Sequence, residues 1–419
     1  MNKSGSFSVQ NFGCRVNQAE SFAWTEALEE RGFVLELDAA RADLVVINSC
    51  TLTSRADRDV RKFIRHVARL NPRARLVVAG CSVENDRGTL AAMPQAWMVL
   101  SNAEKEDLPE RVAAGLTAGP AASPDPLRSR ALLKVQDGCD HNCTFCVIPS
   151  VRGRSRSFSP AGILERARDL TDRGFREIVL CGIHLSSYGR DLEPEGSLAG
   201  LLRELTALPG LGRLRLSSLD PRALDGELLR FIAEDPRLCP HFHLSLQHAS
   251  DHVLKRMGRR SRASEYVDAL GELAALRPEA ALGADIIVGF PGESEPDFEV
   301  LFGFLEASPL NYFHVFAFSP RPGTPAAAWP QVPEADKRRR SAVLRELSAR
   351  KRRAFETGFI GRELEGVVVK KSGGAAVVLT GNYIDVRVPA NGARPGSGVR
   401  VRIDEEVRGE LLGAVTVRV

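Results

Sequence analysis

Three cysteines crowd into one short segment of the chain. Cys139, Cys143 and Cys146 form a CxxxCxxC run directly after a predicted strand. Three thiolates on one loop can hold three irons of a four-iron cluster and leave the fourth iron open to a small molecule. The alternative is a structural zinc site, which needs a fourth ligand such as His141 or a distant residue. The expected place of the loop, at the mouth of a parallel barrel, favours the cluster.

A second set of three cysteines is spread along the N-terminal part of the chain. Cys14, Cys50 and Cys81 each follow the C-terminal end of a successive predicted strand. In an open parallel sheet these ends gather at one edge, where ligands bind, so three thiols can converge on one metal centre. The alternative is coincidence, because buried cysteines are common. Cys181 and Cys239 have no such partners, and we interpret them as small core residues.

Further candidates for a cofactor pocket stand at predicted strand ends in the middle of the chain. Gly182, Ser217 and Gln247 each follow a strand, and Gly289 opens a turn in which the backbone can approach a ligand. Phe145, between two of the clustered cysteines, is a candidate to cover an aromatic ligand. We find no Ser–His–Asp or paired-carboxylate motif and therefore predict no catalytic acid or base.

The elements that must position these residues alternate between strand and helix. Four early strands with helices between them indicate a doubly wound parallel sheet. The proline-rich segment 119–126 is typical of a linker. Six more strand–helix units predict a partial (β/α)6 barrel, followed by a long basic helix. From Gly358, short β-rich runs predict a small antiparallel barrel. The predicted strands are Phe7–Phe12, Leu44–Ile47, Leu76–Ala79, Trp97–Leu100, Leu132–Val135, Glu177–Leu180, Arg213–Leu216, Phe242–Leu246, Ala284–Val288 and Tyr312–Phe318.

The composition of the 419 residues indicates the class of protein and its cellular location. The hydrophobic fraction of 43% and the charged fraction of 26% are ordinary for a globular protein. No signal peptide and no apolar run of about 18 residues is present, so we expect a cytoplasmic protein without a membrane partner. Eight cysteines in such a protein are not expected to form disulfides. From Lys337 to Arg362, ten residues are basic and two acidic, which indicates either a polyanionic partner or a solvated helix face.

These motifs carry a family resemblance that covers essentially the whole chain. The CxxxCxxC run resembles the signature of radical S-adenosylmethionine (SAM) enzymes, and the strand-end cysteines and the β tail resemble the methylthiotransferases. The resemblance implies an N-terminal methylthiotransferase domain at 1–118, a radical SAM domain at 127–357 and a TRAM-like RNA-binding domain at 358–419. It also implies SAM and two 4Fe-4S clusters. The first cluster would be held by Cys139, Cys143 and Cys146, and an auxiliary one by Cys14, Cys50 and Cys81.

Two segments resemble one branch of this family. Asn11–Gln18 and Cys181–Gly189 look most like the branch that modifies N6-threonylcarbamoyladenosine in tRNA. The resemblance implies transfer of a methylthio group to carbon 2 of that base beside the anticodon, with tRNA as partner and a flavodoxin or ferredoxin as electron donor. Polar groups for the threonylcarbamoyl carboxylate are expected at Arg15, Asn17, Gln18 and His184. The alternatives are isopentenyladenosine in tRNA, an aspartate of a ribosomal protein, or a non-catalytic zinc-containing RNA-binding protein.

Overall fold

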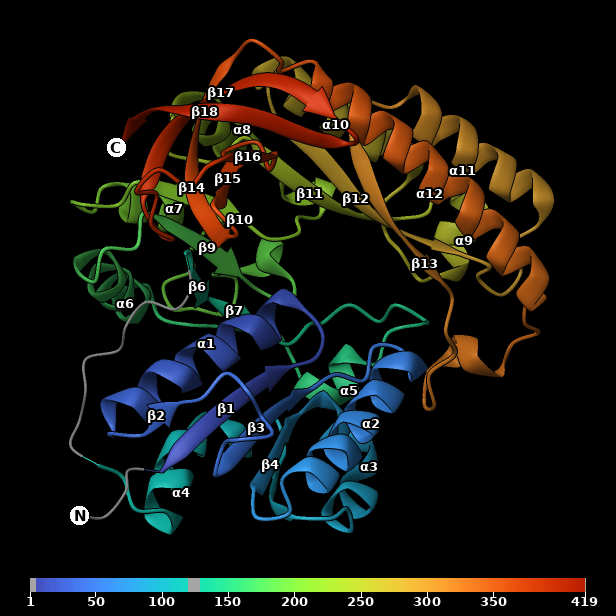
Figure 1. Ribbon diagram of the computed structural model, residues 1–419. Coiled ribbons are helices and arrows are strands. Elements are labelled where there is room, and N and C mark those ends of the chain that lie inside the picture. Colours follow the sequence, from blue (N-terminus) through green and yellow to red (C-terminus); the bar gives the residue numbers. More distant parts are fainter. Residues whose placement is uncertain (1–4, 120–128, 419) are drawn as a thin grey trace. The chain divides into compact units, whose positions relative to one another are not determined.

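The computed structural model describes residues 5–119 and 129–418 (Figure 1). The chain packs as two compact units. The N-terminal unit combines Met1–Asp125 with Asp137–Ser155 and Ser319–Ala327, and the C-terminal unit combines Pro126–Gln136, Arg156–Phe318 and Ala328–Val419. The three-domain division stays a prediction, and the predicted linker lies outside the described residues except for Gly119. In the described part of the chain, no helix is long and apolar enough to cross a membrane.

A five-stranded parallel sheet forms the centre of the N-terminal unit. Its strand order is β2-β1-β3-β4-β5, with every neighbouring pair parallel. The strands are β1 (Ser6–Asn11), β2 (Val34–Leu35), β3 (Leu44–Ser49), β4 (Arg75–Gly80) and β5 (Ala96–Leu100). Every residue of β3 is buried, as expected for a central strand that is covered on both faces. The four predicted strands are therefore confirmed, and the two-residue β2 is an addition to them.

Helices cover both faces of this sheet. Alternate residues of β3 point to opposite cores: Val45 and Ile47 pack in the core that includes α2, and Leu44 and Val46 pack in the core that includes α1 and α4. The helical elements are α1 (Arg15–Glu30), α2 (Ser54–Leu70), α3 (Cys81–Ala91), η1 (Glu104–Asp107), α4 (Leu108–Gly115) and α5 (Ile148–Arg152). The alternation of strand and helix predicted from the sequence is confirmed in this unit.

Six parallel strands form the sheet system of the C-terminal unit. They lie in two three-stranded sheets, of order β10-β9-β6 and β11-β12-β13. Two backbone hydrogen bonds join the sheets, from Leu219 N to His243 O (2.8 Å) and from Ser245 N to Leu219 O (3.0 Å). The strands are β6 (Ala131–Lys134), β9 (Glu177–Cys181), β10 (Arg213–Leu216), β11 (His241–Gln247), β12 (Ala281–Val288) and β13 (Tyr312–Ala317). All six fall on strands that the sequence predicted.

Helices follow these strands in the chain, as in a βα repeat. They are α6 (Pro160–Asp172), α7 (Leu198–Thr206), α8 (Gly226–Glu234), α9 (Asp251–Arg256), α10 (Ala263–Leu276), α11 (Glu295–Ala307) and α12 (Glu334–Thr357). Short elements complete the list: β7 (Gln136–Asp137), β8 (Arg156–Ser157), η2 (Leu185–Ser187), η3 (Pro221–Ala223) and η4 (Pro325–Ala328). Since parallel strands share one direction, the residues that follow β9 to β12 stand at corresponding strand ends.

The C-terminal β-rich region is a closed five-stranded barrel of order β14-β15-β16-β18-β17. Its strands are β14 (Glu363–Ser372), β15 (Ala375–Thr380), β16 (Asp385–Pro389), β17 (Gly398–Val407) and β18 (Glu410–Arg418). The prediction of an antiparallel barrel is wrong for one pairing, because β16 and β18 run parallel. The reason is geometric. An odd number of strands cannot alternate in direction all the way around a closed ring, so one neighbouring pair must be parallel.

Buried arginines join this barrel to the start of the parallel strands. Arg215 donates to the carbonyl oxygens of Gly381 (2.9 Å) and Thr380 (3.1 Å), and Arg213 donates to that of Glu365 (2.9 Å). Both guanidinium groups also contact the buried Glu177 carboxylate, at 2.7 Å. Burial alone would raise the pKa of Glu177, but Arg215 and Arg213 outweigh it and hold that pKa at about 2. The barrel therefore lies at the amino ends of β9 and β10, away from the strand ends that carry the predicted site residues.

Most of the basic side chains of α12 have partners inside the C-terminal unit. Arg340 is buried and pairs with Glu293 and Glu295, each at 2.9 Å. Lys351 donates to three backbone carbonyl oxygens. Further ion pairs join Lys337 to Glu334, Arg339 to Glu295, Arg350 to Glu306, Arg352 to Glu356 and Arg353 to Glu406. Much of the positive charge that the sequence concentrates here thus stabilises the packing of the helix.

Candidate metal centres and cofactor site

The structure brings Cys14, Cys50 and Cys81 to one edge of the N-terminal sheet. Cys50 directly follows β3, Cys81 directly follows β4, and Cys14 follows β1, and these three strands are neighbours in the sheet. Gly13 has a φ of +114°, and a Cβ added to it would lie 2.5 Å from Cβ and 2.7 Å from Sγ of Cys50. The loop that carries Cys14 therefore lies directly against Cys50.

The environment of Cys50 also shows that the three thiols are neighbours. Burial raises the pKa of Cys50 to about 12, and the thiols of Cys14 and Cys81 add to the rise, whereas a hydrogen bond from the Leu52 backbone N–H (3.5 Å) opposes it. Without a metal, this thiol is held protonated. An iron ion displaces such a proton when it binds the sulfur, so the group is suited to bind metal but not to act as a free nucleophile.

Asn17 holds the Cys14 loop in place. Its Nδ2 donates to the carbonyl oxygens of Phe12 (3.0 Å) and Ser49 (2.9 Å) and to Oδ1 of Asn48 (3.1 Å). Its Oδ1 accepts from Sγ of Cys14 at 3.3 Å. Asn17 is buried, and all of these bonds are internal, so the structure gives it a supporting role and not the substrate contact that we predicted.

The two residues beside Asn17 differ from it. Arg15 is exposed, and its Nη1 donates to Oε1 of Gln18 at 3.2 Å. Arg15 and Gln18 therefore remain candidates for a polar pocket, whereas Asn17 does not.

A buried arginine that sequence reasoning missed stands among these groups. The Arg152 side chain is 0% exposed, and its Nη1 lies 3.0 Å from Glu20 Oε1 and 2.8 Å from Asp137 Oδ1. Burial lowers the pKa of Arg152, but Glu20 and Cys81 lead the groups that raise it well above its usual value. Burial raises the pKa of Cys14, and Arg152 opposes that rise. Arg152 thus offers a fixed positive charge to the strand-end thiols. The position of Arg152 in the sequence relative to the cysteines forms no motif from which its role could have been predicted.

The CxxxCxxC loop is also shaped by its backbone. Cys146 N donates to Cys143 O (3.1 Å) in a tight turn, and the N–H groups of His141 and Ile148 donate to Sγ of Cys139 (3.4 Å) and of Cys146 (3.5 Å). Cys50 makes the same contact with the N–H two residues later. Hydrogen bonds from backbone N–H groups to sulfur stabilise thiolates that ligate iron.

A zinc ion bound by several cysteines needs their sulfur atoms close together. Two thiolates on one tetrahedral zinc lie about 3.8 Å apart, since each Zn–S bond is about 2.3 Å. Among the described residues, no group of three side chains whose ligand atoms lie within 4.8 Å of one another contains a cysteine. In a cluster each thiolate binds a different iron, so such crowding is not required. Both sets of cysteines belong to the N-terminal unit.

The predicted cofactor contacts of the C-terminal unit stand at successive strand ends. Gly182 and Ser217 directly follow β9 and β10, Gln247 ends β11 with a φ of +69°, and Gly289 directly follows β12. The Ser217 hydroxyl is buried and has no hydrogen-bond partner among residues 5–119 and 129–418. A buried hydroxyl without a partner fits a site that a polar ligand completes.

Two of the glycines are explained by packing against protein. A Cβ at Gly289, where φ is +70°, would lie 2.3 Å from Cγ of Lys337, and a Cβ at Gly182 would lie 3.0 Å from Oε1 of Gln136. The close approaches expected for a ligand are therefore made by side chains at these two positions. Phe145 is half-buried in the cysteine loop of the N-terminal unit.

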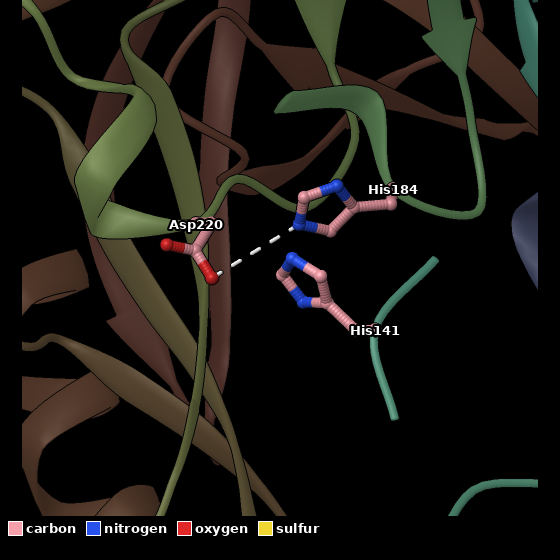
Figure 2. Close-up of side chains that lie close together, drawn as sticks. All are labelled: His141, His184 and Asp220. Carbon is pink, nitrogen blue, oxygen red and sulfur yellow. Dashed lines mark ion pairs between the residues drawn. The ribbon is translucent and has the colours of Figure 1, made fainter. Parts of the chain in front are cut away.

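His184, the remaining predicted substrate contact, faces an acidic residue. Figure 2 shows its imidazole directed at Asp220, with Nε2 and Oδ2 4.0 Å apart. Its backbone N–H donates to Oε1 of Gln136 at 2.8 Å. Burial alone would raise the pKa of Asp220, but His184, Arg259 and Arg222 outweigh it and hold the pKa well below its usual range. Asp220 is therefore an anion that faces His184 at the end of β9.

Comparison with known proteins assigns the family. Residues 133–305 match the model of the radical SAM superfamily, and residues 6–101 match that of the uncharacterized protein family UPF0004. The chain is 36% identical over 399 residues to threonylcarbamoyladenosine tRNA methylthiotransferase MtaB of Aquifex aeolicus (strain VF5), covering 91% of this chain and 96% of that one. It belongs to the radical SAM methylthiotransferases.

Other relatives of this methylthiotransferase carry two different names. The MtaB protein of Chlamydia pneumoniae is 35% identical, with 98% of each chain covered. A tRNA-2-methylthio-N(6)-dimethylallyladenosine synthase of Cereibacter sphaeroides (strain ATCC 17025 / ATH 2.4.3) is 34% identical, with 99% of each chain covered. Among solved structures, the radical SAM methyltransferase TsrM of Kitasatospora setae matches with a TM-score of 0.54 at 15% identity, over 78% of this chain and 77% of that one, which shows a shared fold.

Family membership confirms several predictions. The protein is an enzyme that uses SAM and a 4Fe-4S cluster, as radical SAM proteins do. The non-catalytic zinc-binding alternative is therefore wrong. Identity alone does not separate the two named branches, because they match at 36% and 34%.

Proposed function

We propose that the protein transfers a methylthio group to carbon 2 of N6-threonylcarbamoyladenosine, next to the anticodon of tRNA. The observation that carries this proposal is the second cysteine site, in which Cys14, Cys50 and Cys81 meet at the ends of three neighbouring strands. A SAM-binding cluster on the CxxxCxxC loop accounts for radical chemistry, and a second three-thiolate site supplies a place for sulfur. The MtaB name of several relatives and the resemblance of Asn11–Gln18 and Cys181–Gly189 to that branch support this choice of substrate.

Each cluster has its ligands in this proposal. Cys139, Cys143 and Cys146 hold one 4Fe-4S cluster, which leaves one iron for SAM, and Cys14, Cys50 and Cys81 hold the second. When bound, these groups supply one-electron chemistry that activates a C–H bond, which acid–base side chains cannot do.

The remaining residues bind, orient and balance charge. Arg152 offsets the negative charge of the strand-end thiolates, and Glu20 and Asp137 hold its guanidinium in place. Ser217 offers an unused hydroxyl at the end of β10 to a polar atom of SAM.

The barrel at 358–419 is the proposed TRAM-like tRNA-binding part. Lys370 and Lys371 on β14 and Arg387 on β16 are exposed there. Cationic groups that contact phosphate supply affinity without sequence preference. Most of the basic side chains of α12 are paired within the C-terminal unit. The barrel is therefore the better candidate for the RNA-binding surface. A flavodoxin or ferredoxin is the proposed electron donor, and the cytoplasm is the expected location.

Mass spectrometry of tRNA nucleosides from cells that lack this protein tests the proposal. We expect 2-methylthio-N6-threonylcarbamoyladenosine to disappear and its precursor without the methylthio group to accumulate, with any methylthio-isopentenyladenosine unchanged. The reverse pattern would keep the enzyme class and contradict the branch.

Iron and acid-labile sulfide in the anaerobically prepared protein test the two clusters. Replacing Cys14, Cys50 and Cys81 by Ala should remove about half of the iron, since each three-thiolate set is assigned one cluster.

A further inference from the structure

Three side chains outside the cysteine sites converge on one face of the β11-β12-β13 sheet. His243 Nε2 lies 3.2 Å from Oδ1 of Asp285, and His314 Nδ1 lies 3.3 Å from the same oxygen. Asp285 pairs with His314 in the β12–β13 register, and His243 pairs with Gly283, two residues before Asp285. The alternation of side chains along a strand therefore places all three groups on one face. Their ligand atoms all lie within 4.8 Å of one another.

The spacing matches the ligand set of a divalent metal ion. Two donors bound to zinc at about 2.0–2.2 Å lie about 3–3.5 Å apart in tetrahedral geometry. Two imidazole nitrogens and one carboxylate oxygen are the three protein ligands of a common type of four-coordinate zinc site, in which water is the fourth ligand, and they also occur with other transition metals. The three side chains are 10%, 30% and 59% exposed for His243, Asp285 and His314, so an ion can reach the group from solvent on the β13 side.

Neighbouring groups orient His243 as metal ligands require. The Tyr312 hydroxyl lies 3.3 Å from Nδ1 of His243 and 2.7 Å from Nε2 of His241. This contact fixes the outer ring nitrogen of His243 and turns Nε2 toward Asp285. Gly283 makes room for the tyrosine, because a Cβ there would lie 2.2 Å from Cζ of Tyr312. The second shell of a metal site is therefore in place.

We propose that His243, Asp285 and His314 bind one divalent transition-metal ion, of which zinc is the best match, and leave a coordination position open to water or to an oxygen of a ligand. This site is in the C-terminal unit and shares no residue with either cysteine set, so it does not depend on the proposed reaction. Bound metal would tie together β11, β12 and β13, because each strand supplies one ligand.

Zinc binding to the full, anaerobically reconstituted protein tests this inference. The protein is dialysed against buffered Zn²⁺, and zinc and iron per chain are measured by elemental analysis. We expect His314→Ala and Asp285→Asn to bind about one zinc fewer than the unchanged protein, with iron content unaltered. Some zinc can bind cysteines that have lost their cluster. This amount is the same in all variants, so it does not change the difference in zinc content between them.

His252 supplies the matched control. It is 58% exposed, and its Nδ1 lies 3.2 Å from Asp297, yet within residues 5–119 and 129–418 this pair belongs to no group of three His, Cys, Asp or Glu side chains with ligand atoms within 4.8 Å of one another. His252→Ala should keep the zinc. Tyr312→Phe should keep the stoichiometry and weaken zinc affinity roughly ten- to a hundredfold, as expected for loss of a second-shell partner. Zinc should also raise the melting temperature of the unchanged protein but not of His314→Ala.

Two results would overturn the site. One is equal zinc in the unchanged protein and in His314→Ala at equal iron content. The other is loss of the same zinc in His252→Ala, which would mean that any exposed histidine–aspartate pair suffices.

Discussion

Arg152 and Asn17 are 135 residues apart in the chain, and Nη2 of Arg152 donates to Oδ1 of Asn17 at 2.6 Å. The same Oδ1 accepts from Sγ of Cys14. One amide oxygen thus links the segment after the CxxxCxxC run to the first strand-end cysteine. Asn102 forms a comparable link, with Nδ2 3.7 Å from Sγ of Cys81 and 2.5 Å from the Val151 carbonyl oxygen. The strand-end thiols are therefore held by residues that arrive from a distant segment.

The first prediction concerns this arginine. Arg152→Ala should destabilise the N-terminal unit by about 3–5 kcal/mol, because it removes a buried cation from the carboxylates of Asp137 and Glu20, the second of which also pairs with Lys105 at 2.9 Å. It should also lower the iron content, since the strand-end thiols lose their nearest fixed cation. Thermal unfolding and iron analysis measure both effects. Arg154→Ala is the control, because that side chain is 93% exposed and should change neither. Full iron content in Arg152→Ala would contradict the role assigned to Arg152.

The second prediction concerns the glycine before Cys14. Gly13→Ala should abolish the strand-end cluster, because φ is +114° and the new Cβ would overlap Cys50. About half of the iron should be lost, with the loop cluster retained. Gly88→Ala is the matched control. Gly88 lies in α3 with no atom within 4 Å of the added Cβ, so this change should keep the iron and stabilise the helix by about 0.5–1 kcal/mol. If Gly13→Ala retained all its iron, the cysteine assignment at this edge would be wrong.

The third prediction concerns Glu177, at the start of β9, and the pH dependence of the protein's stability. The pKa of Glu177 falls from its ordinary value of 4.5 to about 2 in the folded protein. A depressed folded pKa contributes stability above the unfolded value, and this contribution is lost as the pH falls from about 4.5 toward 2. The melting-temperature gap between the unchanged protein and Glu177→Gln should therefore be widest near pH 7 and should narrow below about pH 4.5.

A surface pair provides the comparison for Glu177. Glu306→Gln removes an exposed partner of Arg350 and should cost at most about 1 kcal/mol at any pH. A gap for Glu177→Gln that stays constant between pH 7 and about pH 3 would mean that its carboxylate charge does not hold Arg213 and Arg215.

Much of this architecture could be predicted from the sequence, and the cysteines show why. Parallel strands bring their C-terminal ends to one edge, so three strand-end thiols imply a common site without any knowledge of side-chain geometry. Arg152 could not be found in this way, and the supporting role of Asn17 could not be recognised, because both depend on a contact between residues more than a hundred positions apart. Gly289 shows a second reason for a glycine at a strand end. A glycine at a strand end predicted a ligand nearby, but the side chain that approaches it is Lys337.

The charge of α12 could not be interpreted from the sequence alone, for a physical reason. The sequence shows which residues are basic but not which have acidic partners, and the partners of Arg340 and Arg353 come from other segments.

The fourth prediction follows from this. Lys370→Ala together with Lys371→Ala, on the barrel, should weaken tRNA binding and reduce the salt dependence of the binding constant by about two phosphate contacts. Arg350→Ala, on α12, should have little effect because Arg350 is paired with Glu306. Affinity measured over a salt series distinguishes the two, and a larger loss for Arg350→Ala would place the RNA surface on the helix.

The last prediction tests the branch through Arg15. The threonylcarbamoyl group carries a carboxylate, whereas an isopentenyl group is apolar, so a site for the former needs a cation or hydrogen-bond donors. Arg15 is exposed next to Cys14 and donates to Gln18, whereas Asn17 is buried and bonded within the loop, so Arg15 is the candidate that we test. In cells that carry Arg15→Ala in place of the natural gene, methylthio-threonylcarbamoyladenosine should fall at least about tenfold, since a polar group of the substrate loses its partner. Iron content should stay at the unchanged level, because Arg15 contributes no ligand.

Arg55→Ala is the control, since Arg55 is an exposed arginine on α2 paired only loosely with Asp59, at 3.6 Å. Unchanged nucleoside levels in Arg15→Ala would remove Arg15 from the substrate site. A parallel loss of iron would instead assign it to the cluster.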